Sequence, residues 1–201
     1  MKIFFDLDGT LLDSKSRLYH LFQFLVPESK LTFKNYWDIK QDKISHRDLL
    51  IKHFNYSDEN ISRFTKEWMS LIEAPEWLCY DKVIAGVKPF LDSLKDINEL
   101  YIVTARQSEQ VARRQIEDLG LEGIFKDILV TLQKTEKKDL ISQRFKLDNN
   151  DWIIGDTGKD IETGKFLNIK TAAVLSGFVS EYHLKTYSPD VIVSDITLLR
   201  F

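Results

Sequence analysis

The chain has 201 residues, of which 43% are hydrophobic, and this is enough for one well-packed core with room for an insertion. Its formal net charge of -3, from 28 basic and 31 acidic residues, provides no general surface for a polyanion and argues against nucleic acid as a partner. No apolar run approaches the roughly 18 residues of a membrane-spanning helix, and the single cysteine, Cys79, cannot form an internal disulfide. We therefore expect a soluble, cytoplasmic and monomeric protein whose partners are small molecules.

The N-terminal stretch combines a buried strand with two acids. Residues 3–5 are apolar and predict a short strand, after which Asp6 and Asp8 stand on alternate positions before Gly9. Open α/β sheets bind ligands just outside the carboxyl ends of their strands, so this placement favours a catalytic site. An Asp-Gly pair between apolar residues is also a strong signal for a β-hairpin, and these residues alone leave both alternatives open.

The next part of the chain is predicted to form a small helical insertion. Helical spacing and capping patterns predict helices over residues 18–25, 33–40, 45–54 and 57–72. Because the insertion directly follows the acid pair, its two ends should lie close together above the crevice. The loop over residues 41–47 is expected to face that crevice, with His46 and Arg47 as substrate contacts.

From Gly86 onward, short apolar strands alternate with amphipathic helices. The expected strands cover residues 100–103, 127–130, 152–154, 171–174 and 191–193, and the expected helices cover residues 87–95, 108–119 and 136–145. This alternation is typical of a parallel sheet covered on both faces, with right-handed crossovers. We predict an α/β fold with a doubly wound parallel sheet, in which residues 1–13 and 86–201 form the core and residues 14–85 form a helical cap.

Further polar side chains follow the later strands. One predicted strand leads to Thr104, and a later one is followed by Asp156 and Asp160. These two acids should converge with Asp6 and Asp8 at adjacent strand ends, where so much negative charge requires a cation. Because neither Cys nor His accompanies them, the oxygen ligands favour a hard divalent ion such as Mg²⁺.

The order of these motifs resembles the haloacid dehalogenase-like hydrolase superfamily. The matching motifs are Asp6-Leu7-Asp8-Gly9-Thr10, Thr104 after its strand, Lys134 at the start of a helix, and Gly155-Asp156-Thr157-Gly158-Lys159-Asp160. The resemblance extends from Lys2 to about Asp195, although within the cap only the helical character matches. It implies the phosphatase branch of the superfamily, with a cap inserted after the first motif and Mg²⁺ as cofactor.

The resemblance also implies a role for each motif residue. Asp6 would attack phosphorus and form an aspartyl-phosphate, while Asp8 would protonate the leaving oxygen and then take a proton from water. The Thr104 hydroxyl and the Lys134 ammonium would hold the phosphoryl oxygens. The implied metal ligands are Asp6, the backbone carbonyl of Asp8, Asp156 and, as a ligand or as the holder of a metal-bound water, Asp160.

The sequence leaves alternatives for the motif lysine and for the residues that contact the substrate. Lys137 and Lys138 follow Lys134, which is preferred because it stands at the predicted helix start and near the family's usual distance from Gly155. Arg106, shortly after the strand, is expected to make an additional phosphate or substrate contact.

The predicted function is Mg²⁺-dependent hydrolysis of a small phosphorylated metabolite, such as a sugar phosphate, phosphoglycolate or a nucleoside monophosphate. A phosphosugar mutase is one alternative, because relatives share the aspartyl-phosphate and differ in whether water or substrate accepts the phosphoryl group. A non-catalytic metabolite-binding protein is another, which the intact motifs disfavour. Dehalogenation is disfavoured because Asp8 and the metal site belong to the phosphotransferase branch.

Overall fold

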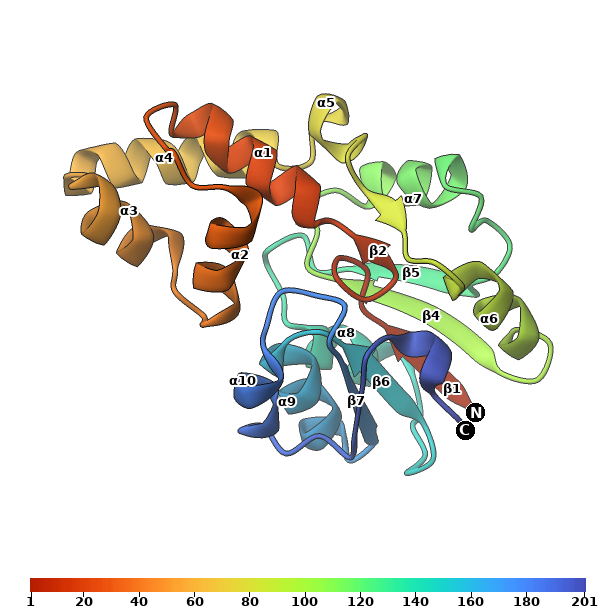
Figure 1. Ribbon diagram of the computed structural model, residues 1–201. Coiled ribbons are helices and arrows are strands. Elements are labelled where there is room, and N and C mark those ends of the chain that lie inside the picture. The colour runs from red at the N-terminus through yellow and green to blue at the C-terminus, as the bar shows by residue number, and fades with distance from the viewer.

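The computed structural model describes residues 1–201 and contains a six-stranded parallel sheet. Its strands are β1 (Lys2–Phe5), β4 (Glu99–Thr104), β5 (Asp127–Val130), β6 (Trp152–Gly155), β7 (Lys170–Val174) and β8 (Val191–Val193). They lie in the order β5-β4-β1-β6-β7-β8, so the chain crosses to either side of the central β1 (Figure 1). This change of direction opens a crevice at the carboxyl end of β1. The predicted fold class, a doubly wound parallel sheet, is confirmed.

The chain after β1 turns in a tight loop and does not form a hairpin with that strand. β1 pairs in parallel with both β4 and β6, which excludes the hairpin alternative. The amides of Leu11 and Leu12 both donate to the carbonyl of Leu7 at 3.0 Å, while Gly9 adopts a φ of 86°. A Cβ at Gly9 would lie 2.5 Å from Oδ2 of Asp156, so a larger residue would force these two segments apart.

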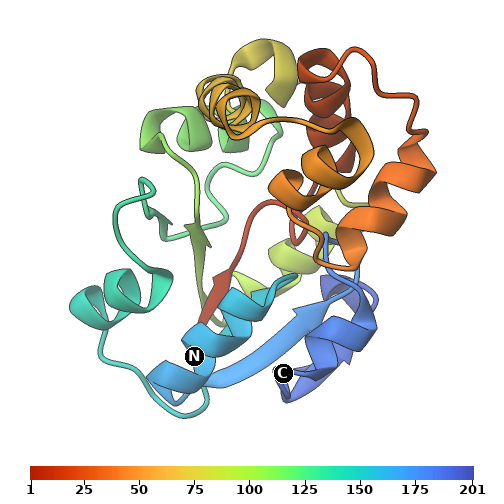
Figure 2. The same ribbon diagram turned by 90° about the vertical axis from the view of Figure 1, so that its left-hand side faces the viewer.

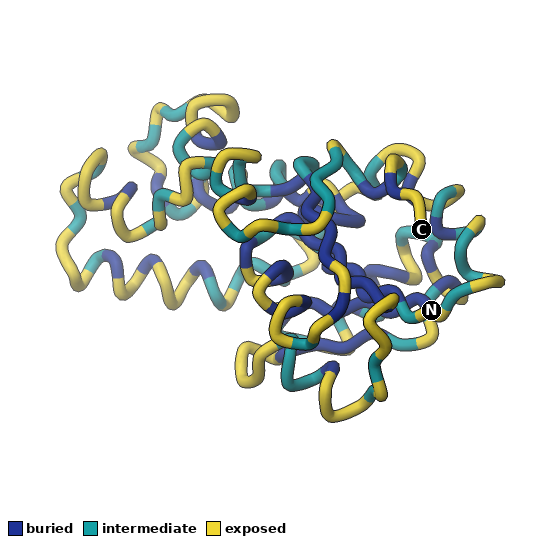
Figure 3. The backbone as a smooth tube through the Cα atoms, turned by 90° about the horizontal axis from the view of Figure 1, so that it is seen from below, coloured by how far each residue is buried: buried dark blue, intermediate teal, exposed yellow.

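Helices cover both faces of the sheet. One face packs against α6 (Val87–Leu94), α7 (Glu109–Asp118) and the 3₁₀ helix Ile196–Leu198, and the other against α8 (Lys137–Arg144), α9 (Gly158–Leu167) and α10 (Glu181–Lys185). Because successive strand side chains point to opposite faces, Ile3 and Phe5 join the first cluster while Phe4 joins the second. All three are fully buried, and Figure 3 shows the sheet as a buried centre with exposed segments around it.

Five further helices gather to one side of the sheet (Figures 1 and 2). They are α1 (Lys15–Leu25), α2 (Phe33–Gln41), α3 (His46–Phe54), α4 (Asp58–Leu71) and α5 (Pro75–Leu78). They bury an aromatic-rich cluster of their own that includes Phe22, Tyr36 and Trp68. We refer to these helices as the cap, and the exact limits predicted for it, residues 14–85, stay a prediction. No helix of the chain combines the length and apolar character needed to cross a membrane.

The contacts of the cap with the rest of the molecule include two separate places. The chain enters through β2 (Leu12–Asp13) and leaves through β3 (Lys82–Val83), and these two strands pair in an antiparallel ribbon. At the opposite edge, the ring of Trp37 stacks on Phe178 with centroids 5.5 Å apart. The crevice above β1 therefore lies under a cap that is held on two sides.

Gly164 lies where α9 approaches the sheet most closely. A Cβ at this position would lie 2.4 Å from Cγ2 of Thr171 and 2.5 Å from Cγ2 of Ile153. We expect Gly164→Ala to lower the free energy of unfolding by about 1–3 kcal/mol, because overpacking outweighs the gain in helix propensity. Urea unfolding followed by circular dichroism measures this change.

Lys165→Ala is the matched control, because Lys165 is exposed on the same helix. It should change the free energy of unfolding by less than about 0.5 kcal/mol. Equal losses in the two variants would contradict the close approach of α9 to the sheet.

Candidate active site

Three carboxylates meet at the carboxyl ends of β1 and β6. Oxygen atoms of Asp6, Asp156 and Asp160 lie within 4.8 Å of one another. Asp6 is 8% exposed, and the other two are each 1% exposed. The structure thus brings together three of the four acids that were expected to converge, and we call these three residues the acid cluster.

One lysine faces the acid cluster. The Nζ atom of Lys137 lies 2.5 Å from Oδ1 of Asp6 and 2.5 Å from Oδ1 of Asp160. Burial raises the pKa of Asp6 to about 7, with Lys137 opposing the rise and Asp160 adding to it. Burial also raises the pKa of Asp156, and the charges of Asp6 and Asp160 raise it further. A single ammonium group therefore faces three carboxylates.

The donor set of the acid cluster fits a divalent cation. Oδ1 of Asp156 is buried without a hydrogen-bond partner, while Oδ2 accepts from the amide of Phe178 at 2.7 Å. A buried carboxylate oxygen that lacks a partner and lies beside two other carboxylates has the chemistry of a ligand for a hard, oxygen-preferring ion. Asp6, Asp156 and Asp160 are the residues that would hold Mg²⁺.

The position expected for Lys134 is occupied by Lys137. Lys134 is exposed on the turn that precedes α8, and no ion pair joins it to the acid cluster. In this turn Leu132 and Gln133 have φ values of 55° and 56°, and the helix begins only at Lys137. The expectation that Lys134 opens this helix is not met, because the left-handed turn places the helix start at Lys137, and Lys137 is the lysine that contacts the acid cluster.

Asp8 points toward arginines instead of joining the acid cluster. Nε and Nη2 of Arg106 bind its two oxygens at 2.5 and 2.7 Å, and Nη2 of Arg17 lies 2.5 Å from Oδ1. The Ser14 hydroxyl donates to the same oxygen at 2.7 Å. Burial would raise the pKa of Asp8, but the two guanidinium groups outweigh it and hold this pKa well below its usual range.

A second carboxylate, that of Asp81, forms ion pairs with the same two arginines. Its oxygens lie 3.2 Å from Nε of Arg17 and 3.3 Å from Nη2 of Arg106, and Nε2 of Gln115 donates to it at 2.8 Å. Arg17, Asp81, Arg106 and Gln115 are all buried. Arg106, predicted as a substrate contact, is thus held by protein carboxylates, although its Nη1 is buried without a partner.

A pocket of about 360 Å³ between the sheet and the cap joins these groups. Its lining includes Asp6, Asp8, Thr104, Arg106, Lys137 and Asp156 from the core, and Arg17, Met69, Ile72 and Glu73 from the cap. Thr104 ends β4 and is 1% exposed. The pocket therefore presents a potential nucleophile, a hydroxyl group and an ammonium group to one small volume.

Comparison with known proteins agrees with this arrangement. Residues 3–174 match the family of haloacid dehalogenase-like hydrolases. The chain belongs to this family. The predicted resemblance is thereby confirmed, and the match includes the segments that carry Asp6, Thr104, Lys137 and Asp156.

Two curated relatives of the family align along nearly the whole chain. One is a pyrophosphatase, PpaX, from Oceanobacillus iheyensis, which is 24% identical over 96% of this chain and 92% of its own length. The other is a phosphoglycolate phosphatase from Aquifex aeolicus, which is 28% identical over 96% of this chain and 91% of its own. Among solved structures, a haloacid dehalogenase-like hydrolase from Streptococcus pneumoniae superposes with a TM-score of 0.79 at 24% identity, covering 96% of this chain and 93% of that one. This last likeness shows a shared fold.

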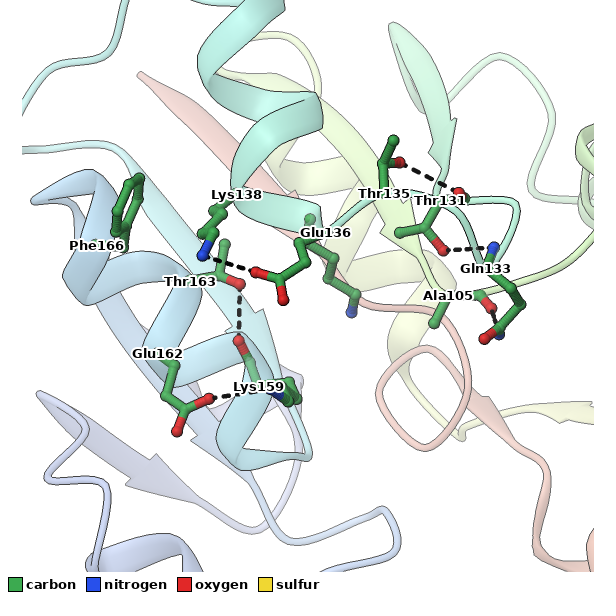
Figure 4. Close-up of a pocket in the computed structure, with 11 residues that line it drawn as sticks. Ala105, Thr131, Gln133, Thr135, Glu136, Lys138, Lys159, Glu162, Thr163 and Phe166 are labelled. Atoms are coloured by element: carbon green, nitrogen blue, oxygen red, sulfur yellow. Dashed lines mark hydrogen bonds and ion pairs between the residues drawn. The ribbon is translucent and has the colours of Figure 1, made fainter.

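A second pocket of about 510 Å³ opens beside the first, between α8 and α9 (Figure 4). Two of its cations are paired with neighbouring glutamates, since Lys138 lies 2.7 Å from Glu136 and Lys159 lies 3.7 Å from Glu162. Lys137 lines both pockets. The second pocket is thus a polar extension of the first.

The cap loop predicted to face the crevice contacts the core elsewhere. The carbonyl of Gln41 accepts from the amide of Ser180 at 3.3 Å, and Lys43 donates to the Tyr187 hydroxyl at 2.5 Å. This side of the cap therefore packs near α10.

His46 and Arg47, the predicted substrate contacts, do not line the pocket. The ring of His46 packs against Trp68 with centroids 4.3 Å apart and lies 2.8 Å from the hydroxyl of Tyr36. Arg47 is exposed and pairs with Asp58 at 2.6 Å. Both residues begin α3, and its hydrophobic packing turns them away from the crevice.

The sequence did not single out the cap residues that do reach the pocket. Arg17 follows Ser14 by about one helical turn but carries no motif, and Glu73 stands in a short link between two helices. Arg17 contacts Asp81 and Glu73 contacts Gln107, both far away in the sequence, so only the tertiary structure reveals these contacts.

His46 allows a test of the cap that does not depend on activity. Burial, together with the nearby charge of Lys40, lowers the pKa of His46 to about 3. Below about pH 6.5 the His46 ring therefore binds a proton in the unfolded state but not in the folded state. The free energy of unfolding consequently falls as the pH decreases through that value. Between about pH 7.5 and 5.5 the free energy of unfolding should fall in both proteins. We expect the fall to be smaller in His46→Gln than in the wild type, by up to about 1.4 kcal/mol. Urea unfolding at each pH, followed by tryptophan fluorescence, measures the difference.

The control for this test is His53→Gln, because His53 is exposed on the same helix. It should keep the pH dependence of the wild type. If both variants gave the wild-type dependence, His46 would not be held neutral by the cap.

Proposed function

We propose that the chain is a Mg²⁺-dependent phosphatase that hydrolyses a small phosphomonoester through an aspartyl-phosphate on Asp6. The observation that carries this proposal is the position of the Asp6 carboxylate, which lines the pocket between Lys137 and two further acids. Membership of a hydrolase family and the names of two relatives, a pyrophosphatase and a phosphoglycolate phosphatase, support it.

In the first step, Asp6 attacks phosphorus and the bond to the leaving oxygen breaks. Lys137 opposes the rise in the Asp6 pKa and so favours its ionised form before the attack, and it then neutralises charge on the phosphoryl oxygens, toward which Thr104 donates its hydroxyl proton. Mg²⁺ held by the acid cluster would supply the additional positive charge that phosphoryl transfer requires.

In the second step, water attacks phosphorus and releases Asp6. The ion pairs with Arg106 and Arg17 hold Asp8 in its ionised form, which is the form that accepts a proton from this water. Protonation of the leaving oxygen in the first step requires a neutral Asp8, so the arginines must withdraw from its carboxylate before it acts as an acid.

The size of the pocket supports a small substrate. The pocket beside Asp6 has a volume of about 360 Å³, which is within the range of small-molecule pockets and accommodates a small metabolite. We therefore propose a small phosphorylated metabolite as the partner of this site.

Removal of the metal and of the nucleophile tests the mechanism. We expect the protein to release phosphate from at least one small phosphomonoester, EDTA to abolish the release, and Mg²⁺ to restore it. Asp6→Asn should lower kcat by at least about 10³-fold without loss of stability, because a carboxamide is a poor nucleophile and the change relieves like-charge repulsion. Phosphate assays and thermal unfolding measure both effects.

Asp38→Asn, at an exposed position of α2, is the control and should retain full activity. Turnover that is independent of metal, or an Asp6→Asn variant near the wild-type rate, would contradict the mechanism.

The two lysines give a separate test. Lys137→Ala should lower kcat/KM by about 10²-fold to 10³-fold for every substrate, because the phosphoryl oxygens lose a positioned cation. Lys134→Ala removes the same charge from the exposed turn and should change kcat/KM by less than about twofold. Steady-state kinetics of both variants measure the contrast, and a larger loss for Lys134→Ala would reverse our assignment.

A further inference from the structure

A carboxylate of the cap binds the N-terminus of a core helix inside the pocket. Glu73 lies between α4 and α5, and its Oε1 accepts from the amide of Gln107 at 2.6 Å while its Oε2 accepts from the amide of Ser108 at 3.3 Å. The Gln107 side chain donates to the carbonyl of Met69 at 2.8 Å and ties the same two segments together. Free amides and the helix dipole favour an anion at such a position, and here Glu73 is that anion.

The side chain that precedes these amides also favours an anion. Arg106 lines the same pocket and is 4% exposed, yet its Nη1 has no hydrogen-bond partner. A buried N–H donor without a partner carries an energetic cost, so this guanidinium favours negative charge nearby, and the Glu73 carboxylate supplies such a charge. The pocket thus has a second anion position, separate from the acid cluster, and Glu73 already occupies it.

The cations that line the pocket each have a carboxylate neighbour. Arg17 and Arg106 are paired with Asp8 and Asp81. Lys137 is paired within the acid cluster, and Lys159 has an 83% exposed side chain near a glutamate. A second negative group that lies on the Glu73 side of the pocket would therefore meet this carboxylate.

We infer that Glu73 is a specificity-determining residue that discriminates against phosphomonoesters whose leaving group carries a second negative charge. The inference rests on the proposed phosphatase function and narrows its substrates to those with an uncharged leaving group. A second carboxylate or phosphate has to displace Glu73 from two amides or lie beside a like charge, and either event weakens its binding. An uncharged leaving group, such as a polyol, requires neither.

The test compares two substrates of similar size, 2-phosphoglycolate and 2-hydroxyethyl phosphate, which differ in a carboxylate and a hydroxymethyl group. Glu73→Gln keeps an oxygen acceptor for the amide of Gln107 but removes the charge. We expect the ratio of kcat/KM for phosphoglycolate over hydroxyethyl phosphate to rise by about tenfold or more, because a like-charge contact is lost. The kcat/KM for hydroxyethyl phosphate should stay within about threefold of the wild type. Glu76→Gln, at an exposed position of the adjacent α5, is the matched control and should leave the ratio unchanged.

A binding measurement keeps the test independent of turnover. Titration calorimetry with phosphonoacetate and ethylphosphonate compares the same two charge states in molecules that lack the scissile ester bond. Glu73→Gln should tighten phosphonoacetate binding about tenfold relative to ethylphosphonate. An unchanged ratio in kinetics or binding, or an equal loss for both ligands, would overturn the inference and reduce Glu73 to a structural contact. Absence of phosphatase activity in the wild type would overturn the proposed function instead, and the binding ratio would still decide the role of Glu73.

Discussion

The site depends on uncompensated negative charge at the centre of the sheet. Three carboxylates at adjacent strand ends lie within 4.8 Å of one another, and Lys137 is the one cation that touches them. Burial and this repulsion raise the carboxyl pKa values and favour a bound cation, so the same arrangement that costs stability also creates affinity for a metal ion. Gly9 and Gly177 allow this crowding, because a Cβ at either position would lie less than 3 Å from Asp156.

A second group of charges joins the cap to the core. Asp8 follows β1, Arg17 lies in the first cap helix, Asp81 precedes β3 and Arg106 follows β4, so four segments meet in one cluster of two carboxylates and two guanidinium groups. Because all the charges are paired, the cluster is neutral and can be buried. A change in the position of Arg17 would therefore alter the ion pair with Asp8, the residue to which we assign the proton transfers.

The sequence predicted the core well because its signals there are local. Each strand is a short apolar run, and Asp6 and Asp156 come directly after such runs, so their place at the sheet edge follows from strand direction alone. The start of α8 depends on left-handed backbone at Leu132 and Gln133, which are not glycines, and nothing in the sequence marks that turn. Without knowledge of this turn, the sequence does not distinguish Lys134 from Lys137 as the lysine that contacts the acid cluster.

The cap contacts were harder to predict, because they depend on how helices pack against one another. His46 stands at a helix start, a position that is usually exposed, but here the aromatic cluster encloses its ring. Arg17 contacts Asp8 and the carbonyl of Ile72, which are 9 and 55 positions away, and Glu73 contacts Gln107, which is 34 positions away. Periodicity and motifs describe neighbours along the chain, and they carry no information about such pairs.

The ribbon of β2 and β3 restricts how the cap can move. Both crossings of the chain lie in one narrow strip, where Leu12 pairs with Val83 and Asp13 pairs with Lys82. Helix α2 contacts the core away from this strip, where the ring of Trp37 stacks on Phe178. The amide of Phe178 in turn donates to Asp156. The cap is thus linked to a carboxylate of the acid cluster through one aromatic contact and one backbone hydrogen bond.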